Sequence, residues 1–351
     1  MTWQDAFGYQ ARTCADLGSP FTSCLLGLVA SRGLPAGAIR DRIAAWPGDI
    51  SARGASVPLR LAGALHRLVL EARAPALAAF YPPNENVSDD ALWSVVCEAL
   101  VDRESTLMDW LGTPPQTNEV GRSAFLIPAA AWLTHITGLP LALSELGASA
   151  GLNLRFDRYA LVAGERRFGP ENPALTLSPV WRGMPPRAAD LRVSERTGAD
   201  LNPADPASDR LRLLSFIWPD QPDRLARMTA AIGEARRTPA TIERTDAIDY
   251  LARRLAQPMP GRLHMIFHTI AWQYFPAAAQ QRGKTLLARA GALATREAPL
   301  ARVAMEADDR SPGAGLKITL WPGGRCFDMG RADFHGRWID WQAPDPEPFR
   351  W

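Results

Sequence analysis

The stretch Leu139–Asp157, LPLALSELGASAGLNLRFD, decides the fold. Its apolar beginning, residues 139–146, predicts a buried strand that only Ser144 and Glu145 interrupt. A turn of small residues follows at 147–151, GASAG, and the residues after it can wind as a helix. Small residues let a ligand approach the main chain, and the first N–H groups of a helix have no internal partner. A strand, such a turn and a helix together predict a cradle for a phosphate or a cofactor.

Composition and charge exclude several classes of protein. The chain has 351 residues, enough for one large or two ordinary domains, and its 47% hydrophobic and 22% charged residues are typical of a globular protein. A net charge of +2 is too small for the basic surface with which proteins bind nucleic acid. We therefore expect no nucleic-acid partner.

The cysteines and the N-terminus bear on the location of the protein. The four cysteines are Cys14, Cys24, Cys97 and Cys326. No two of them have the short spacing of a zinc site or a disulfide framework, which suits a reducing cytosol. The N-terminus carries charges without a long apolar segment, and no run of about 18 apolar residues could span a membrane. We expect a cytoplasmic protein with no metal site and no membrane span.

Hydrophobic periodicity divides the chain into two regions. Residues 1–115 predict helices, and the Pro114-Pro115 break is the best domain boundary. From Leu139 onward, short apolar strands alternate with helical patterns, which is typical of a parallel sheet with crossover helices. The predicted domains are an α-helical N-terminal region, residues 1–115, and a Rossmann-like α/β domain, residues 116–351.

The second region predicts a mostly parallel sheet that ends in an antiparallel hairpin. Its predicted strands are residues 139–146, 191–201, 240–245, 263–270, 302–306, the hairpin 316–321 and 325–329, and 337–341. A turn-rich insertion near residues 159–190 predicts a hairpin and a loop. No helical pattern stands between the fifth strand and the terminal hairpin.

Polar side chains follow the carboxyl ends of the predicted strands, where ligands of open parallel sheets bind. The first strand offers Glu145 and the glycine turn. The second ends in Asp200, whose carboxylate can accept both hydroxyls of a ribose. The third ends in Asp246, which could accept a hydrogen bond from an adenine amino group, and the fourth ends near His268. These positions predict a site for a nucleoside-bearing cofactor.

The segment Gln116–Arg122 precedes an apolar helix that we expect beside the turn. A run of hydrogen-bonding residues in this place is usually a helix cap. Asn118, Glu119 and Arg122 could also reach a ligand. The guanidinium of Arg122 could hold a carboxylate through two parallel hydrogen bonds.

The order of E-x-G-x-x-x-G at 145–151, D-L-N-P at 200–203 and T-D at 245–246 resembles the class I S-adenosylmethionine-dependent methyltransferase fold. The resemblance covers residues 116–341, with Ser149 at the middle position of the usual G-x-G-x-G. It implies that the turn holds the methionine part of S-adenosylmethionine, the second-strand acid the ribose and the third-strand acid the adenine. Together with the residues expected beside the turn, the predicted cofactor contacts are Asn118, Arg122, Glu145, Gly147, Ala148, Ser149, Gly151, Asn153, Asp200, Leu201 and Asp246. His268 becomes the candidate to orient or deprotonate the methyl acceptor.

The full chain more specifically resembles a bacterial family of uncharacterised proteins, domain-of-unknown-function family 2332. The matching segments are Gln116–Arg122, Glu145–Leu154, Asp157–Tyr159, Trp218–Gln221 and His335–Arg337. That family brings no assigned activity, so the resemblance predicts architecture rather than function.

A second interpretation of the turn makes Ser149 a nucleophile, because GASAG also matches the G-x-S-x-G elbow of α/β-hydrolases. Asp246 or Asp308, followed by His335, would complete the order Ser, Asp, His. The helical texture of residues 1–138 and the lack of an oxyanion stretch before the turn favour the cofactor interpretation. A third class, a binding or regulatory protein that uses the same fold without chemistry, also stays open.

Structural roles compete with each functional role. Gly147 and Gly151 could be plain turn residues, and Asn153 could cap a helix. Asp200 could pair with an arginine, and Asp246 could cap the helix that follows it. His268 lies in an apolar strand, where histidines are commonly satisfied core residues. The hypothesis from the sequence is nevertheless an S-adenosylmethionine-dependent methyltransferase for a small molecule, with the helical region as lid and acceptor pocket.

Overall fold

The computed structural model describes residues 2–84, 88–116 and 118–350, and the chain forms two compact units. The helical unit comprises Met1–Thr117 together with Ser208–Ala226, and the sheet unit comprises Asn118–Ala207 together with Arg227–Trp351. The chain therefore leaves the sheet unit after residue 207, returns to the helical unit for 19 residues, and then completes the sheet unit.

The helical unit is built from short helices around one apolar core. Its helices are α1 (Trp3–Asp16), α2 (Pro20–Arg32), α3 (Ala38–Ala44), α4 (Val57–Leu70), α5 (Pro75–Ala78), α6 (Asp89–Asp102), α7 (Glu104–Leu111) and α9 (Arg210–Ser215). Side chains of Thr2, Ser19 and Ser88 accept hydrogen bonds from the first turns of α1, α2 and α6, which explains where these helices begin. Apolar faces such as Leu61 and Leu65 of α4 are fully buried.

The returning segment Ser208–Ala226 belongs to this helical core. Leu213 and Leu214 of α9 are buried, and His66 Nδ1 of α4 lies 3.2 Å from the carbonyl oxygen of Ser215. The sequence placed everything after residue 115 in the second domain. The structure differs because an apolar helix face is buried wherever a complementary surface exists, and that surface is on α4.

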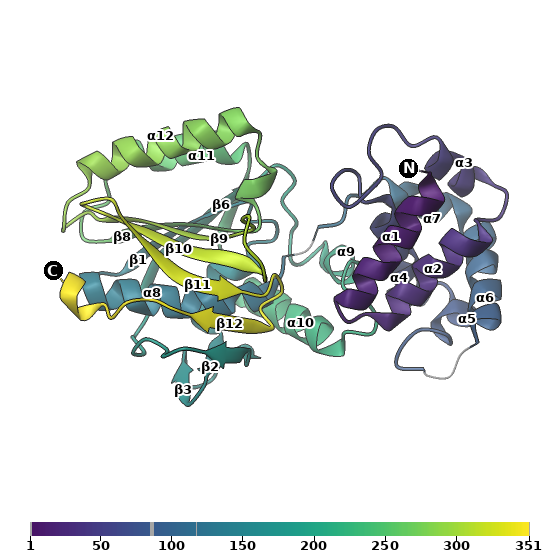
Figure 1. Cartoon of the computed structure of the whole chain (residues 1–351), viewed down its shortest axis with the longest axis horizontal. Coiled ribbons are helices and arrows are strands. Elements are labelled where there is room, and N and C mark those ends of the chain that lie inside the picture. The colour runs from purple at the N-terminus through teal and green to yellow at the C-terminus, as the bar shows by residue number, and fades with distance from the viewer. Residues whose placement is uncertain (1, 85–87, 117, 351) are drawn as a thin grey trace. The chain divides into compact units, whose positions relative to one another are not determined.

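The sheet unit contains a sheet of nine strands among the described residues (Figure 1). The strands, in chain order, are β1 (Leu141–Leu146), β5 (Val180–Arg182), β6 (Val193–Asp200), β7 (Thr241–Arg244), β8 (Leu263–Thr269), β9 (Leu300–Glu306), β10 (Ala314–Trp321), β11 (Arg325–Ala332) and β12 (Trp338–Trp341). They lie in the order β5-β12-β11-β10-β9-β8-β1-β6-β7. β7, β6, β1, β8 and β9 are parallel, and β9, β10, β11 and β12 are antiparallel.

Helices cover both faces of the parallel strands. α11 (Ala247–Arg254) and α12 (Ala277–Leu293) lie on one face, and α8 (Ser123–Thr137) lies on the other (Figure 1). β1 and β8 are buried along their whole length, because strands with helices on both faces meet no water. α10 (Pro222–Arg237) carries the chain back into the sheet unit.

The strand order reverses between β1 and β8. From β1 the chain proceeds to β6 and β7 on one side, then returns to β8 and β9 on the other. At such a reversal the connections leave the carboxyl ends of two neighbouring strands in opposite directions, which opens a place for a ligand. The α/β class and the mostly parallel sheet with a terminal hairpin, both predicted from the sequence, are confirmed.

The insertion after β1 forms a separate small sheet. η2 (Leu152–Arg158) leads to β2 (Ala160–Ala163), β3 (Arg166–Phe168) and β4 (Thr176–Leu177), which pair in the order β3-β2-β4. β2 and β3 form the hairpin that the turn-rich sequence predicts. Within the described residues no helix stands between β9 and β10, so the sheet continues there as an antiparallel meander.

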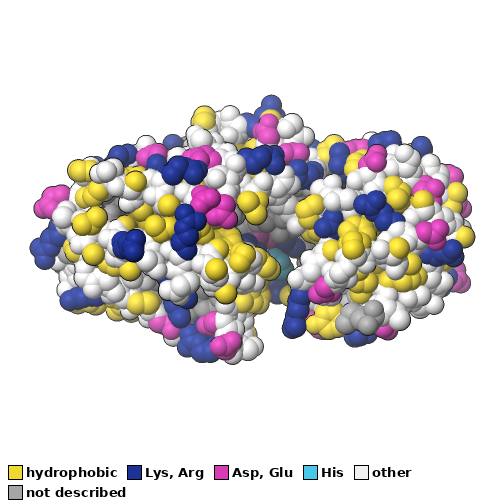
Figure 2. Space-filling view, turned by 90° about the horizontal axis from the view of Figure 1, so that it is seen from above, with side chains coloured by type: hydrophobic (Ala, Val, Ile, Leu, Met, Phe, Trp, Pro, Cys, Tyr) yellow, Lys and Arg dark blue, Asp and Glu magenta, His cyan; other side chains and the backbone are white. Residues whose placement is uncertain are grey.

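None of the helices in the described part of the chain is long and apolar enough to cross a membrane. Basic and acidic side chains are interspersed on the face drawn in Figure 2, so neither sign of charge dominates that face.

Candidate functional site

The turn Gly147–Gly151 at the end of β1 is tied to the neighbouring strand. The N–H groups of Gly147 and Ala148 both donate to the carbonyl oxygen of Ala199 in β6, at 2.9 Å each. The N–H group of Ser149 donates to Asp200 Oδ2 at 2.8 Å. The two strand ends are therefore locked together, and part of the Asp200 carboxylate is used in doing so.

The two glycines of the turn are required by packing inside the protein. Gly147 and Gly151 have φ values of +72° and +65°, a region that L side chains rarely adopt. A Cβ atom on Gly147 would lie 2.7 Å from Ala271 Cβ, and one on Gly151 would lie 2.6 Å from Ile242 Cδ1. The protein's own side chains thus occupy the space that the sequence assigned to a ligand above these glycines.

The residues after the turn form a kinked 3₁₀ helix, not a regular α-helix. η2 has non-helical backbone angles at Arg155, and its first residues are fully buried. Asn118 Oδ1 accepts the N–H of Leu152 at 2.7 Å, so a protein side chain already satisfies this donor. One of the donors on which the predicted anion cradle depends is therefore already used within the protein.

Glu145 is the most unusual group at this end of the sheet. Its side chain is only 2% exposed, and Oε2 has no hydrogen-bond partner among the described residues. Burial raises the pKa of Glu145 well above its ordinary value, and the nearby Asp200 adds to that increase. Arg155 and Arg122 act in the opposite direction without cancelling it.

Both of these arginines are bonded to main-chain carbonyls. Arg155 is 3% exposed, and its guanidinium donates to the carbonyl oxygens of Thr238 (2.9 Å) and Gly151 (2.5 Å). Arg122 donates to the carbonyl oxygens of Phe334 (3.0 Å) and Thr269 (2.9 Å). Their charges act on Glu145 through space, while their hydrogen bonds hold loops together.

Asn118 and Asn153 belong to a buried polar network under the turn. Ser123 Oγ donates to Asn153 Oδ1 at 2.7 Å, and Asn153 Nδ2 donates to the carbonyl oxygen of Glu119 at 3.3 Å. The structure thus places Asn118 and Glu119 next to the residues that follow the turn, where the sequence predicts them. Their hydrogen bonds join α8 and η2 to each other, which is a structural role.

The acids at the ends of β6 and β7 both have local hydrogen bonds. Asp200 accepts from Asn202 N–H through Oδ1 (2.8 Å), in addition to the bond from the turn. Asp246 Oδ1 accepts the N–H groups of Ile248 (2.8 Å) and Asp249 (3.0 Å) and so caps α11. Beside Asp200, the side chain of Leu201 is 72% exposed, which is unusual for a leucine.

Ser149 lacks the features of a catalytic nucleophile. Its side chain is 6% exposed, its φ is +52°, and its Oγ is buried without a hydrogen-bond partner among the described residues. A nucleophilic serine needs an exposed oxygen and a base within hydrogen-bond reach. Of the two candidate acids, Asp246 caps α11 and Asp308 is paired with Arg331 at 2.9 Å. The surroundings of Ser149 therefore do not support a serine hydrolase.

His268 is a fully buried histidine with both ring nitrogens engaged. Nδ1 lies 2.6 Å from Glu306 Oε1, and Arg302 Nε donates to Nε2 at 3.0 Å. These contacts fix the neutral form with its proton on Nδ1, and burial lowers the pKa of His268. Its ring also stacks on Trp272, with ring centroids 5.1 Å apart. Neither ring nitrogen is therefore left to orient or deprotonate a methyl acceptor.

The sequence did not predict which side chains from other segments pack against the carboxyl end of β1. Arg155 gave a weak signal, as an arginine inside the buried run after the turn, whereas Ala271 and Ile242 gave none. In the portion of the chain that the structure describes, no group of three or more His, Cys, Asp or Glu side chains is placed to hold a metal ion.

Comparison with known proteins gives a family and no activity. A family model described as an uncharacterised protein conserved in bacteria, DUF2332, matches residues 4–341. The chain belongs to this family. The family resemblance drawn from the sequence is thereby confirmed. Searches of curated proteins and of solved structures found no match.

Segments that carried the DUF2332 resemblance meet beside the carboxyl end of β8. A Cβ atom on Gly336 would lie 2.2 Å from the carbonyl oxygen of Gly121, so the two glycines pack back to back. Arg122, next in the chain, bonds Phe334 on one side and Thr269 at the end of β8 on the other. In this DUF2332 chain, Gly121 and Gly336 allow the two segments to pack closely, and Arg122 joins both of them to the end of β8.

Proposed function

We propose that the sheet unit binds S-adenosylmethionine at the carboxyl end of β1 and that the protein transfers the methyl group to a small molecule. The observation that carries the proposal is Glu145, a fully buried carboxylate with an unpartnered oxygen at the point where the strand order reverses. A buried, unpaired carboxylate is costly, and a cationic ligand group would offset that cost. S-adenosylmethionine carries two such groups, an ammonium and a sulfonium.

Strand order supports a nucleotide-type ligand. The parallel strands β7-β6-β1-β8-β9 follow the order 3-2-1-4-5 of sheets that bind nucleotides at the reversal point. Beyond β9 the sheet continues as a simple meander, so the support comes from this parallel part alone.

The acids on the neighbouring strands retain acceptor capacity for the nucleoside. Each Asp200 oxygen accepts one hydrogen bond, and a carboxylate has about four acceptor positions. Asp246 uses Oδ1 for its cap, and Oδ2 could accept from an adenine amino group. The exposed Leu201 offers an apolar surface beside them. Gly147 and Gly151 do not add to this fit, because Ala271 and Ile242 lie against them, so the proposal depends on the acids.

The chemistry needs little from the protein beyond placement. S-adenosylmethionine supplies an electrophilic methyl group, and an in-line displacement depends on orientation and exclusion of water more than on a strong base. In this scheme Glu145 would hold a cationic group, and Asp200 would hold the ribose hydroxyls. A second candidate, ligand binding without chemistry, is favoured by the absence of an available base at His268.

Calorimetry with S-adenosylmethionine tests the proposal. Wild-type protein and Glu243→Gln, which removes a carboxylate from β7, should bind alike, whereas Glu145→Gln should bind about tenfold or more weakly. Transfer of a radiolabelled methyl group to small molecules in a cell extract then separates catalysis from binding alone. Equal affinity of wild type and Glu145→Gln, or no heat at all, would overturn the proposal.

A further inference from the structure

A cavity of about 370 Å³ lies between α12 and the strands β9, β10 and β11. Its volume is within the range of small-molecule sites. In the described chain no helix stands between β9 and β10, so no crossover helix covers this part of the sheet. The opposite face of β9 and β10 is apolar and buried, as the alternation of their side chains requires.

Strand register places a row of polar side chains on the floor of the cavity. Thr319 of β10 is paired with Arg302 of β9 on one side and with Cys326 of β11 on the other. Directly paired residues share a face of the sheet. In the next row Lys317 is paired with the small Ala304, which leaves room beside Arg302.

Arg302 is held rigidly at this floor. Its guanidinium carbon lies 4.4 Å from the centroid of the Trp272 ring, and its Nε donates to His268. His268 is fixed in turn by Glu306, which also accepts N–H groups of Ala271 and Trp272 at 3.1 Å each. The buried histidine thus positions an arginine. The other two guanidinium nitrogens of Arg302 hydrogen-bond to no acceptor among the described residues.

The lysines provide the decisive observation. Lys and Arg together number 39 in this chain, and only two of them are lysines, although lysine is ordinarily among the commonest residues. Both of them, Lys284 of α12 and Lys317 of β10, line this one cavity. A chain that uses arginine at its other basic positions therefore presents its compact, rotatable ammonium groups here alone.

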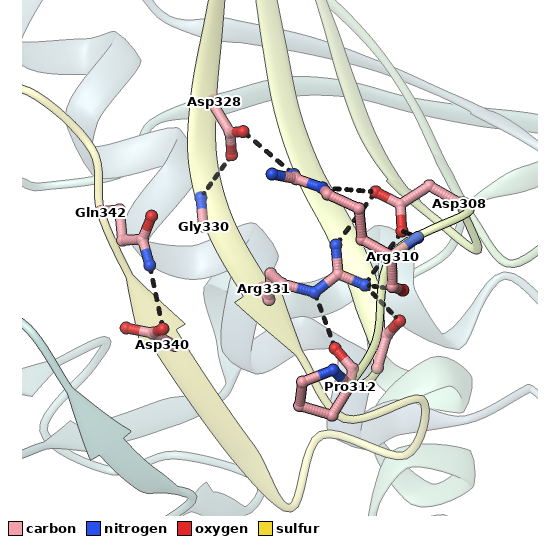
Figure 3. A network of polar contacts seen from close by, with 9 residues as sticks. Asp308, Arg310, Pro312, Asp328, Gly330, Arg331, Asp340 and Gln342 are labelled. Atoms are coloured by element: carbon pink, nitrogen blue, oxygen red, sulfur yellow. Dashed lines mark hydrogen bonds and ion pairs between the residues drawn. The ribbon is translucent and has the colours of Figure 1, made fainter.

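Carboxylates near the cavity already have cationic or N–H partners. Asp308 accepts from both terminal nitrogens of Arg331, at 3.0 and 2.9 Å, and Asp328 is paired with Arg310 at 3.2 Å (Figure 3). Glu306 is occupied by His268 and main-chain N–H groups. Neither lysine forms an ion pair with any residue that the structure describes. Two positive charges are left unmatched beside a fixed arginine.

We propose that this cavity binds a small molecule that carries a phosphate monoester. A phosphate bears a charge of about −1.5 to −2 with three acceptor oxygens, which matches two ammonium groups and the free edge of one guanidinium. A single carboxylate would leave one lysine unmatched. The volume exceeds what a bare phosphate fills, so the ligand includes an organic part, near Gln280 and Thr319. The inference does not depend on the proposed methyl transfer, since its residues lie on β9, β10 and α12.

The scarcity of lysine makes a direct test possible. Reductive ¹³C-methylation keeps the charge of each lysine and gives one NMR signal for each, besides that of the terminal amine. Lys284→Arg and Lys317→Arg assign the two signals. Titration with phenyl phosphate should move both signals to saturation, whereas sodium chloride at matched ionic strength should not.

Calorimetry of the unmodified protein supplies the second measurement. Lys317→Gln and Lys284→Gln should each weaken phenyl phosphate binding about tenfold. Arg289→Gln, which removes a positive charge from α12 outside the cavity lining, should leave it unchanged. Benzoate should bind more weakly than phenyl phosphate. Lysine signals that do not move, equal affinity of Lys317→Gln and wild type, or benzoate binding as tight as phenyl phosphate would each overturn the inference.

Discussion

Replacing Glu145 with glutamine removes a charge and preserves the shape of the side chain. In the wild-type protein this carboxylate is 2% exposed and has an oxygen without a partner, with Asp200 nearby as a second negative charge. Arg155 and Arg122 compensate only through space, because main-chain carbonyls take up their hydrogen bonds. The folded protein therefore favours the protonated form of Glu145, and its pKa is raised by burial.

The sign of the effect on stability follows from that shift. The unfolded chain releases this proton near the ordinary pKa of 4.5, whereas the folded chain keeps it to higher pH. The contribution of protonated Glu145 to the free energy of unfolding is complete below pH 4.5. It is lost as pH rises through the pKa that Glu145 has in the folded protein. Over that window the free energy of unfolding of the wild type should fall by up to about 1.4 kcal/mol per pH unit relative to Glu145→Gln.

Urea unfolding of both proteins at a series of pH values from 4.5 to 8 measures this difference. Subtracting the free energy of unfolding of the variant from that of the wild type removes the contributions of other buried groups. One of them is His264, because burial lowers its pKa to about 3. Binding of a cation at Glu145 should also release protons, which calorimetry in buffers of different ionisation enthalpy detects. Parallel stability curves for the two proteins would refute the reasoning, because they would mean that Glu145 titrates alike in both states.

Three further predictions concern the turn and the buried histidine. Ser149→Gly should raise the free energy of unfolding by up to about 1 kcal/mol, since it removes a positive φ from a residue with a side chain, and fluorophosphonate should label neither protein. Gly147→Ala should cost about 3 kcal/mol in urea unfolding, through its φ and the contact with Ala271. Gly323→Ala, with a φ of +101° and nothing within 4 Å, should cost only the backbone strain of about 1 kcal/mol. Glu306→Gln should destabilise the protein by about 2 kcal/mol in urea unfolding, because His268 and the N–H groups of Ala271 and Trp272 would lose a charged acceptor.

Local patterns in the sequence were sufficient for most elements of the sheet unit. The prediction of a strand at 263–270 corresponds to β8 at Leu263–Thr269, because a short apolar run before a turn has few other solutions. The Pro322-Gly323-Gly324 turn placed the β10–β11 hairpin correctly. Asp246 was read as a possible cap, and its carboxylate caps α11.

Contacts between distant segments were beyond such patterns. Nothing local in 208–226 shows that α9 belongs with α4 of the helical unit. Likewise, the glycine turn looks open in sequence, and only the folded chain brings Ala271 and Ile242 against it. The missing partner of Glu145 is a property of its surroundings, so the residue type alone could suggest a site but not its electrostatics.

The cavity between α12 and the strands β9, β10 and β11 likewise depends on contacts between distant segments. The rarity of lysine is visible in the sequence, but Lys284 and Lys317 are 33 residues apart and meet only through strand register and helix packing. The sequence predicts His268 as a candidate base, whereas in the fold its Nε2 accepts a hydrogen bond from Arg302.

The return of Ser208–Ala226 to the helical unit has a consequence for synthesis on the ribosome. The first 117 residues leave the exit tunnel well before the segment that completes their core. Until that segment is made, His66 lacks its contact with the carbonyl oxygen of Ser215. Meanwhile β1 and β6 emerge and can begin to pair. The helical unit therefore exposes the apolar surface that α9 later covers while part of the sheet is being made. For the same reason, a truncated gene product ending near residue 117 should be insoluble.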